Sequence, residues 1–387
     1  MGLRILYQCN APWVTTGYGV QGKHLVPRLK ALGHEVSYFA FYGLAGGTLN
    51  MDGVQVLPMA NRMWGEDILP AHMKATRSDV HISLMDVWVT EHYGKMAKQF
   101  GWVWLPWTPV DQTPVPPLVV ERLADAHTAL PYAKFGEEEL RKAGVPNVQY
   151  IPHGVDLQSF HAGDKKAARE RTGLPQDKFI IGMIAANKGF PSRKCFPEQL
   201  MAFREFKKHH SDAIMYIHTL VSSEQGGIEF AALLPQLGLD DGSVIFADQY
   251  RYTLGYPESH MADLYRSFDF LSLTSMGEGF GIPLIEAQAC GTPVVCSDNT
   301  AQTELCFGGI LVKEQYPFWT PLNAFAMIPD YRAVHEAYEQ MYDILHDNEQ
   351  AGAIKMAAIN GAMPYSWDNV VNNFWKPLLE KVEKDLG

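Results

Sequence analysis

The amino-acid sequence predicts an α/β protein with two doubly wound, Rossmann-like domains that face a central cleft. Three observations lead to this fold class. Short apolar runs alternate with amphipathic stretches, which is typical of strand–helix–strand units and a parallel sheet covered on both faces. The 387 residues are 47% hydrophobic and 19% charged, as in a globular protein of two or three domains. The Pro/Gly turn Ile151–Asp156 separates two periodic regions.

The first region begins with a buried strand and a glycine-bearing loop. The strand is predicted at Leu3–Gln8 and the loop at Thr15–Gly19. A helix over about Val20–Leu32 follows and is ended by Gly33. Later strands are predicted at Val36–Tyr42, Val80–Met85, Trp102–Trp107 and Ala126–Leu130.

The second region repeats the alternation of strands and helices. Its strands are predicted at Lys178–Ala186, Ala213–His218, Val244–Phe246, Phe268–Thr274 and Thr292–Ser297, and its helices at Pro197–His209 and Pro283–Cys290. Doubly wound domains bind ligands at the carboxyl ends of their strands, so the sequence directs attention to the loops that follow these strands.

Charge and cysteine usage exclude several classes of protein. The net charge is −11, and all of it falls on residues 154–387, because residues 1–153 carry 13 basic and 13 acidic side chains. This balance disfavours bulk nucleic-acid binding, which depends on many basic groups. Five cysteines without a Cys-x-x-Cys pair argue against a disulfide framework and a zinc site.

No apolar run approaches the roughly 18 residues of a membrane-spanning helix. The apolar stretch at the start of the sequence is too short for a secretion signal. We therefore expect a cytoplasmic protein without a transmembrane segment. Attachment to a membrane surface is left open.

The segment Ser275–Ala287 is the most informative part of the sequence. It follows a predicted strand, passes through three glycines and enters a helix with Pro283 in its first turn. Glycines allow close approach of the backbone to a ligand, and the free N–H groups of a helix start form an anion site. Glu278 lies on the loop and Glu286 on the helix. Glu286 either binds sugar hydroxyls or only interacts with the positive end of the helix dipole.

Glu278 and Glu286 are separated by seven residues within Glu-Gly-Phe-Gly-Ile-Pro-Leu-Ile-Glu-Ala, which resembles the E-x7-E motif of retaining GT-B glycosyltransferases. The best match is the large family-4 group, also called group 1, which resembles glycogen and sucrose synthases. The similarity spans most of the chain and continues at Gly33–Val36, Ile151–Asp156, Leu264–Phe270, Cys290–Val295 and Glu304.

The resemblance implies a role for each matching residue of this segment. Glu286 would bond the ribose hydroxyls of the donor nucleotide, and Glu278 would lie beside the donor sugar or its phosphate. The donor sugar and diphosphate would meet the backbone of Phe280, Gly281 and Ile282.

The resemblance also implies donor contacts on other loops. The loop with Gly17 and Gly19 would close on the diphosphate, although a plain strand–helix turn is the alternative reading. Lys194 matches the family's lysine, and the second cation is either Lys188 or Arg193. Fixed cations would stabilise the leaving diphosphate, and a solvated cluster of charges is the alternative.

The sequence is less informative about the residues that would contact the acceptor. Asp111 stands where the family often has a histidine, and it would orient the acceptor hydroxyl or the donor sugar; the alternative is an Asp that stabilises a turn beside prolines. Asp86 is a second candidate, and His153 is interpreted as structural. Six of the nine tryptophans lie in the first 110 residues, where one or two could stack on an acceptor.

The resemblance implies a retaining glycosyltransferase that moves a sugar from a nucleotide-diphosphate sugar to an acceptor hydroxyl. No Asp-x-Asp motif is present, so we expect neither a metal nor another cofactor. The acceptor could be a glycan, a lipid, a small molecule or a modified nucleic-acid base. The alternatives are a sugar-nucleotide epimerase and a non-catalytic two-lobed nucleotide-sugar-binding protein.

The resemblance also predicts how the domains divide. The apolar residues of Ser366–Leu386 predict a terminal helix, which in the resembled family crosses back onto the first domain. We therefore expect residues 1–153 with about 365–387 to form the acceptor-side domain. Residues 154–364 would form the nucleotide-sugar-binding domain.

Overall fold

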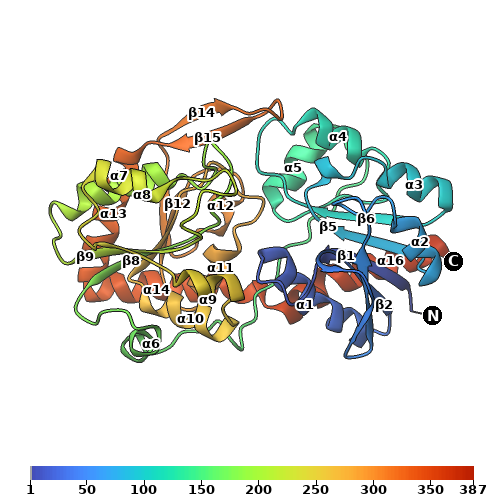
Figure 1. The fold of residues 1–387 in the computed structure, drawn as a ribbon, viewed down its shortest axis with the longest axis horizontal. Helices are drawn as coiled ribbons and strands as arrows, with labels where there is room; N and C mark the ends of the chain where they lie inside the picture. Colours follow the sequence, from blue (N-terminus) through green and yellow to red (C-terminus); the bar gives the residue numbers. More distant parts are fainter. Residues whose placement is uncertain (1) are drawn as a thin grey trace. The chain divides into compact units, whose positions relative to one another are not determined.

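The computed structural model describes residues 2–387. The chain divides into two compact units (Figure 1). The first domain contains the chain as far as Gly154 together with Thr320–Ala324 and Tyr365–Gly387, and the second contains Val155–Trp319 and Phe325–Pro364. Each has a mainly parallel sheet flanked by helices, so the predicted α/β class is confirmed.

The first domain is built on a seven-stranded sheet in the order β3-β4-β2-β1-β5-β6-β7. All neighbours are parallel except β3 and β4. The strands are β1 Arg4–Asn10, β2 Glu35–Ala45, β3 Leu49–Met51, β4 Val54–Met59, β5 Val80–Leu84, β6 Val103–Thr108 and β7 Leu130–Pro131.

Helices connect these strands and cover the sheet. They are α1 Gly17–Ala31, α2 Leu69–Ala75, α3 Tyr93–Phe100, α4 Pro117–Leu123 and α5 Lys134–Lys142, with a 3₁₀ turn at Val87–Val89. The C-terminal segment consists of α15 Trp367–Val370, a π-helical turn Val371–Trp375 and α16 Lys376–Leu386.

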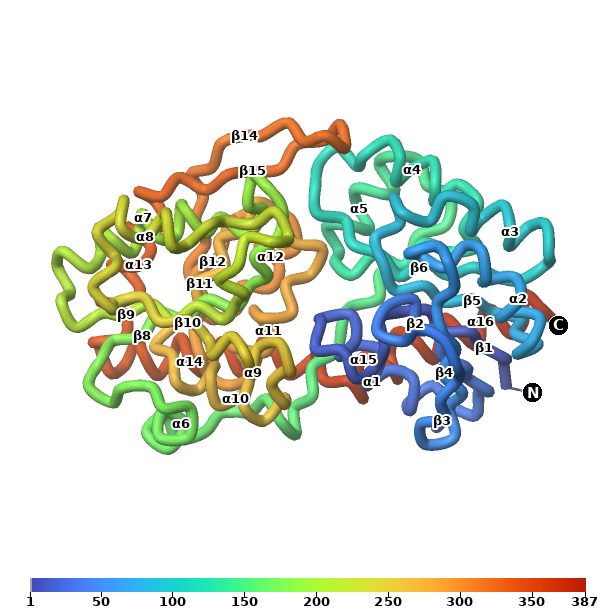
Figure 2. The backbone as a smooth tube through the Cα atoms, viewed as in Figure 1, coloured from blue at the N-terminus to red at the C-terminus, as the bar shows by residue number. Residues whose placement is uncertain are grey.

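The C-terminal segment packs beside the first-domain sheet, as the red tube of Figure 2 shows. The ring of Trp375 meets Trp107 of β6 edge-on at 5.0 Å between centroids, and Phe374 meets Tyr150 at 5.5 Å. Trp107 and Trp375 are both fully buried. Large buried aromatic rings of this kind account for much of the packing energy of a core.

The second domain has a parallel six-stranded sheet in the order β10-β9-β8-β11-β12-β13. The strands are β8 Phe179–Ile184, β9 Ala213–His218, β10 Val244–Phe246, β11 Phe270–Leu273, β12 Val294–Ser297 and β13 Gly309–Val312. An antiparallel hairpin, β14 Gln315–Trp319 and β15 Phe325–Pro329, follows the sheet.

The helices of the second domain lie on both faces of its sheet (Figure 1). They are α6 Lys165–Thr172, α7 Phe196–Lys207, α8 Phe230–Leu237, α9 Gln249–Leu254, α10 Glu258–Ser267, α11 Ile282–Ala289, α12 Ala301–Leu305, α13 Tyr331–His346 and α14 Asn348–Ala362. Aspartate side chains cap the first turns of several of them, namely Asp164, Asp248, Asp330 and Asp347.

The structure corrects three sequence predictions. Helix α1 begins at Gly17 rather than Val20, because the hydroxyl of Thr16 caps it by accepting the N–H of Gly19 at 3.1 Å. The strand predicted at Ala126–Leu130 is reduced to Leu130–Pro131. The hairpin of β14 and β15 was not predicted at all, and its tip, Thr320–Ala324, belongs to the first domain.

An ion pair joins α6 to the sheet of the second domain. Asp269 accepts hydrogen bonds from Arg169 at 2.9 Å, from Lys165 at 2.7 Å and from the backbone N–H of Ile180 at 2.6 Å. The Arg169 side chain is 5% exposed, so its charge depends on this partner. The contacts therefore fix α6 to the amino ends of β8 and β11.

We expect Asp269→Asn to lower the free energy of unfolding by about 3 kcal/mol, because it leaves the buried Arg169 without its counter-charge. Urea denaturation followed by circular dichroism measures this value. Glu170→Gln is the matched control, since Glu170 is an exposed acid on the same helix. Equal stability of the two variants would show that the ion pair contributes nothing net.

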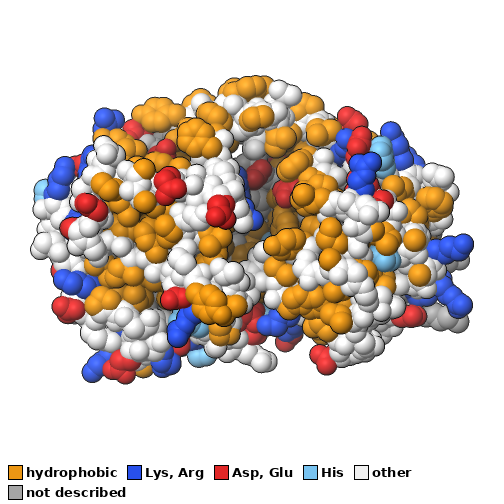
Figure 3. Space-filling model, viewed as in Figure 1, with side chains coloured by type: hydrophobic (Ala, Val, Ile, Leu, Met, Phe, Trp, Pro, Cys, Tyr) orange, Lys and Arg blue, Asp and Glu red, His pale blue; other side chains and the backbone are white. Residues whose placement is uncertain are grey.

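Within residues 2–387, no helix combines the length and the apolar character that crossing a bilayer requires. Hydrophobic side chains reach the surface in both domains (Figure 3). Exposed apolar residues of this kind are normal for a folded protein. The five cysteines are free thiols, and four of them are buried.

Candidate functional site

The strand order of the second domain identifies the place where a ligand would bind. From β8 the chain passes to β9 and β10 on one side, whereas β11, β12 and β13 lie on the other side. In open parallel sheets ligands bind at such a reversal, outside the carboxyl ends of the strands. The loops that follow β8 and β11 therefore form the candidate site.

These two loops meet through charged side chains. The ammonium group of Lys194 forms a direct ion pair with the Glu278 carboxylate. Arg193 lies 3.4 Å from the other carboxylate oxygen and donates to the carbonyl of Gly277 at 2.5 Å. The Glu278 side chain is only 7% exposed. Two cations thus flank one buried carboxylate, which leaves a net positive charge at the strand ends.

Opposing effects set the pKa of Glu278. Burial by itself would raise the pKa, but the charges of Lys194 and Arg193 and hydrogen bonds from Lys194 and Ser275 outweigh burial and lower the pKa to about 2. Glu278 is therefore ionised across the physiological pH range. Its carboxylate holds the two cations in place.

The loop continues into the start of α11, which offers unpaired backbone N–H groups. Gly281 precedes the helix with a φ of +96°, a left-handed conformation that favours glycine. Only the amide of Leu284 in this first turn bonds back, to the carbonyl of Gly281 at 2.9 Å, and Pro283 has no N–H. The helix start and the adjacent cations together suit an anionic ligand.

Glu286 lies one turn further along α11. The hydroxyl of Tyr265, on α10, donates to Glu286 Oε2 at 2.7 Å and leaves the other carboxylate oxygen to a ligand. Burial raises the pKa of Glu286 to about 8, the charge of Glu258 adds to this rise, and the Tyr265 hydrogen bond opposes it. A carboxyl group with this pKa is well suited to exchange hydrogen bonds with hydroxyl groups.

The structure separates the two alternatives for the second cation. Arg193 contacts the Glu278 loop directly. Lys188 is exposed on the preceding part of the loop, where its backbone N–H bonds to the carbonyl of Ala186. The geometry therefore favours Arg193 as the partner of Lys194.

Gly17 and Gly19 lie in the first turn of α1 in the first domain, not in a loop before it. A Cβ atom on Gly19 would lie 2.2 Å from the carbonyl oxygen of Val14. This close approach is a local reason for the glycine, independent of any ligand.

Asp86 and Asp111 follow the neighbouring parallel strands β5 and β6, so both lie at the carboxyl edge of the first-domain sheet. Both are partly buried. His153 is fully buried, bonds to Gln21 at 3.0 Å, and has its pKa lowered by burial to about 3, which agrees with a structural role.

The six tryptophans of the first 110 residues differ in burial, and Trp64 and Trp102 are partly buried. Trp104 and Trp107 are core residues. Trp13 and Trp88 are 40% and 42% exposed, and they follow β1 and β5. These two are the most exposed of the six tryptophans in the first 110 residues.

Two sets of residues at this site had no predicted role. Tyr265 stands in the motif segment Leu264–Phe270, but only the fold brings its hydroxyl to Glu286. The segment Ser297–Gln302 begins at the last residue of β12 and binds the Glu278 loop. Its position at the end of a buried strand was the signal that could have identified it.

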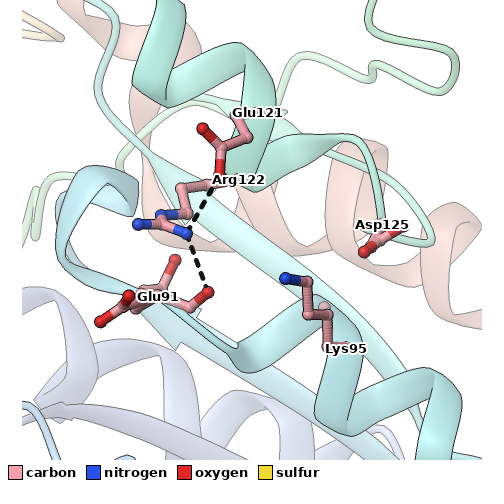
Figure 4. Close-up of a pocket in the computed structure, with 7 residues that line it drawn as sticks. Glu91, Lys95, Glu121, Arg122 and Asp125 are labelled. Carbon is pink, nitrogen blue, oxygen red and sulfur yellow. Dashed lines mark hydrogen bonds and ion pairs between the residues drawn. The ribbon is translucent and has the colours of Figure 1, made fainter.

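A separate pocket in the first domain contains none of the predicted site residues. It is lined by Thr90, Glu91, Gly94, Lys95, Glu121, Arg122 and Asp125. Arg122 already donates to the Glu91 carbonyl at 3.0 Å and lies 3.4 Å from the Glu121 carboxylate, as Figure 4 shows. Acidic groups outnumber basic ones here, which disfavours an anionic ligand.

Comparison with known proteins finds similarity to glycosyltransferases. Residues 244–307, which include Glu278 and Glu286, match the family model described as glycosyl transferases group 1. D-inositol 3-phosphate glycosyltransferase 1 of Catenulispora acidiphila is 29% identical over 255 residues, or 63% of this chain and 54% of that protein. The D-inositol 3-phosphate glycosyltransferase of Mycobacterium tuberculosis is 30% identical over 164 residues, or 41% and 30% respectively. The chain thus spans about half of the first relative and under a third of the second.

Two solved structures share the fold over nearly the whole chain. Sucrose-phosphate synthase from Thermosynechococcus elongatus has a TM-score of 0.76 at 16% identity, covering 98% of this chain and 99% of that one. Anabaena HepE in complex with UDP and glucose has a TM-score of 0.72 at 15% identity, covering 97% and 99%. The predicted resemblance to group 1 glycosyltransferases of the GT-B fold is therefore confirmed.

Proposed function

We propose that this protein is a retaining, metal-independent glycosyltransferase that moves a sugar from a nucleoside-diphosphate sugar to an acceptor hydroxyl. The observation that carries the proposal is the Arg193–Lys194–Glu278 cluster at the strand reversal of the second domain, with Glu286 on the next helix. The comparisons support a glycosyltransferase with a nucleotide-sugar donor.

In this proposal the diphosphate binds at Arg193, Lys194 and the start of α11. As the bond between the anomeric carbon and the phosphate oxygen breaks, the electron pair stays on the diphosphate. Fixed positive groups that already face this position stabilise the developing negative charge without reorganising. Glu278, which lies between the cations, would interact with the sugar, where positive charge develops. The backbone of Phe280, Gly281 and Ile282 would complete the sugar and diphosphate contacts.

Retention of configuration is proposed because the Glu278–Glu286 segment resembles the E-x7-E motif of retaining glycosyltransferases. Attack by the acceptor from the face of the departing phosphate, whose oxygen takes the acceptor proton, balances the reaction. Asp111 of the first domain is our candidate for orienting the acceptor. Nuclear magnetic resonance of the product would give the anomeric configuration, and inversion would refute this part of the proposal.

The experiment that tests the function is a panel of UDP-, GDP- and ADP-sugars, with and without pools of glycans, lipids, small molecules and modified nucleic-acid bases. Release of nucleotide that depends on donor and acceptor, and that persists in EDTA, is the expected result. Conversion of the donor sugar without an acceptor would indicate an epimerase. Binding of a nucleotide sugar without turnover would indicate a non-catalytic protein.

The pKa of Glu286 leads to a prediction about pH. A carboxylate accepts hydrogen bonds from ribose hydroxyls better than its protonated form, and the pKa of Glu286 is about 8. We expect the affinity for the nucleoside diphosphate to rise about tenfold between pH 7 and pH 9, as the ionised fraction rises. Calorimetry measures this rise, and Glu286→Gln should abolish it. A pH-independent affinity in the wild type would show that the ribose does not bind to Glu286.

A further inference from the structure

Thr300 has a backbone conformation that its residue type almost never adopts. Its φ is +54° and its ψ is −140°, in a region occupied essentially only by glycine. A β-branched side chain makes this conformation still less favourable. Thr300 is also nearly fully buried, with 6% of its surface exposed. Strain of this kind persists only where the surrounding structure holds it, and it concentrates at functional sites.

The contacts of Thr300 show what the unusual conformation achieves. Its hydroxyl oxygen accepts the backbone N–H of Glu278 at 2.9 Å and donates to the carbonyl of Asn299 at 2.8 Å. The next residue, Ala301, donates its N–H to the carbonyl of Glu278 at 3.3 Å. Both backbone polar groups of Glu278 therefore bond to Thr300 and its neighbour.

The residues around Thr300 hold the same loop. The carbonyl of Ser275 accepts bonds from Ser297 Oγ at 3.0 Å and Gln302 Nε2 at 3.2 Å. Asn299 Nδ2 donates to the carbonyl of Met276 at 2.7 Å. The segment Ser297–Gln302 thus holds the loop from Ser275 to Glu278 by hydrogen bonds that come almost entirely from its side chains. Thr300 is the member whose side chain bonds to the backbone of Glu278.

A second strained residue lies on the other side of the site. Cys195, which follows Lys194, has a φ of +51° and is fully buried. The backbone N–H of Met276 bonds to the carbonyl of Arg193 at 2.9 Å, so this loop too is tied to the Glu278 loop. Backbone strain therefore occurs in two segments that contact the Glu278 loop, at Cys195 and at Thr300.

We propose that Thr300 is a positioning residue for Glu278, and that its strained backbone is retained because it places the hydroxyl on the Glu278 amide. A glycine would adopt the same backbone without strain but would offer no hydroxyl. The inference rests on the proposed function only for its kinetic readout, since the contact with Glu278 is independent of the reaction.

Three substitutions separate this role from a purely structural one. Thr300→Ser keeps the hydroxyl and should retain at least half of the wild-type kcat. Thr300→Gly removes both the hydroxyl and the strain, and we expect kcat to fall roughly tenfold, as for one lost hydrogen bond. Its thermal midpoint should stay at or above that of the wild type. Thr300→Ala, which loses the hydroxyl but keeps the strain, should lower both quantities.

The matched control is Arg77→Gly. Arg77 is another non-glycine residue with a positive φ, +53°, but it is exposed in the first domain. This variant should leave kcat unchanged. A structural role for Thr300 alone would make kcat and thermal midpoint fall together in Thr300→Gly, and an unchanged kcat in that variant would also overturn the proposal.

Amide hydrogen exchange tests the contact without any assay of activity. The Glu278 amide should exchange at least tenfold faster in Thr300→Gly and Thr300→Ala than in the wild type and Thr300→Ser. If no nucleotide sugar is turned over but this difference is found, the proposed function fails and the positioning role stands. Equal exchange in all four proteins would refute the positioning role.

Discussion

Replacing Lys194 with alanine is expected to weaken the binding of a nucleoside diphosphate by roughly ten- to hundredfold. A hydrogen bond to a charged group contributes about 1.5–3 kcal/mol, which corresponds to this range of affinity. The loss should be larger at low salt, because dissolved ions screen the attraction between Lys194 and the diphosphate. Calorimetric titration at two salt concentrations measures both effects.

Lys194→Ala should also change stability with a defined pH dependence. Lys194 lowers the pKa of the buried Glu278, and a lowered pKa contributes stability above the unfolded-state pKa that is lost as the pH falls toward about 2. The variant should therefore be destabilised most at neutral pH and least in acid. Lys166→Ala, an exposed lysine on α6, is the control for loss of a positive charge alone. Unchanged affinity in Lys194→Ala would show that the diphosphate does not bind at Lys194.

The two glutamates should give opposite kinetic results. The ribose is present equally in the ground and transition states, so Glu286→Gln should raise KM for the donor more than it lowers kcat. Positive charge develops at the sugar only in the transition state. Glu278→Gln should therefore lower kcat, by roughly hundredfold, as for loss of one preorganised electrostatic partner.

The geometry makes the prediction for Glu278 more specific. Its carboxylate offsets part of the positive charge of Lys194, so Glu278→Gln should leave nucleoside-diphosphate affinity unchanged or higher. Steady-state kinetics and calorimetry of both variants test this. If Glu278→Gln abolished nucleotide binding while Glu286→Gln affected only turnover, the two roles would be reversed. If neither variant changed either quantity, the glycosyltransferase proposal would be untenable.

Much of the fold could be predicted because its strands are short buried runs with clear limits. The strands at Ala213–His218 and Val244–Phe246 have the predicted bounds. The start of α1 was misplaced, since glycines at Gly17 and Gly19 look like a loop until the Thr16 cap is seen. The hairpin of β14 and β15 escaped prediction because its pattern lacks the regular alternation of a half-buried strand.

The part of the candidate site that lies on one continuous segment could be predicted from the spacing of its residues. Glu278 and Glu286 lie on one loop–helix segment, so their proximity follows from local sequence. The partners that determine their protonation come from distant segments: Lys194 lies 84 residues from Glu278, and Tyr265 lies 21 residues from Glu286. A single sequence does not reveal such contacts. The backbone conformation of Thr300 is likewise set by tertiary structure against its own preference.

The most direct test of the central claim is a crystal structure of the protein with the nucleoside diphosphate of its donor. The account predicts phosphate oxygens within hydrogen-bond distance of Lys194, Arg193 and the first amides of α11, with the ribose hydroxyls at Glu286. A nucleotide bound elsewhere, for example in the first-domain pocket beside Arg122, with the Lys194–Glu278 pair unchanged, would contradict it.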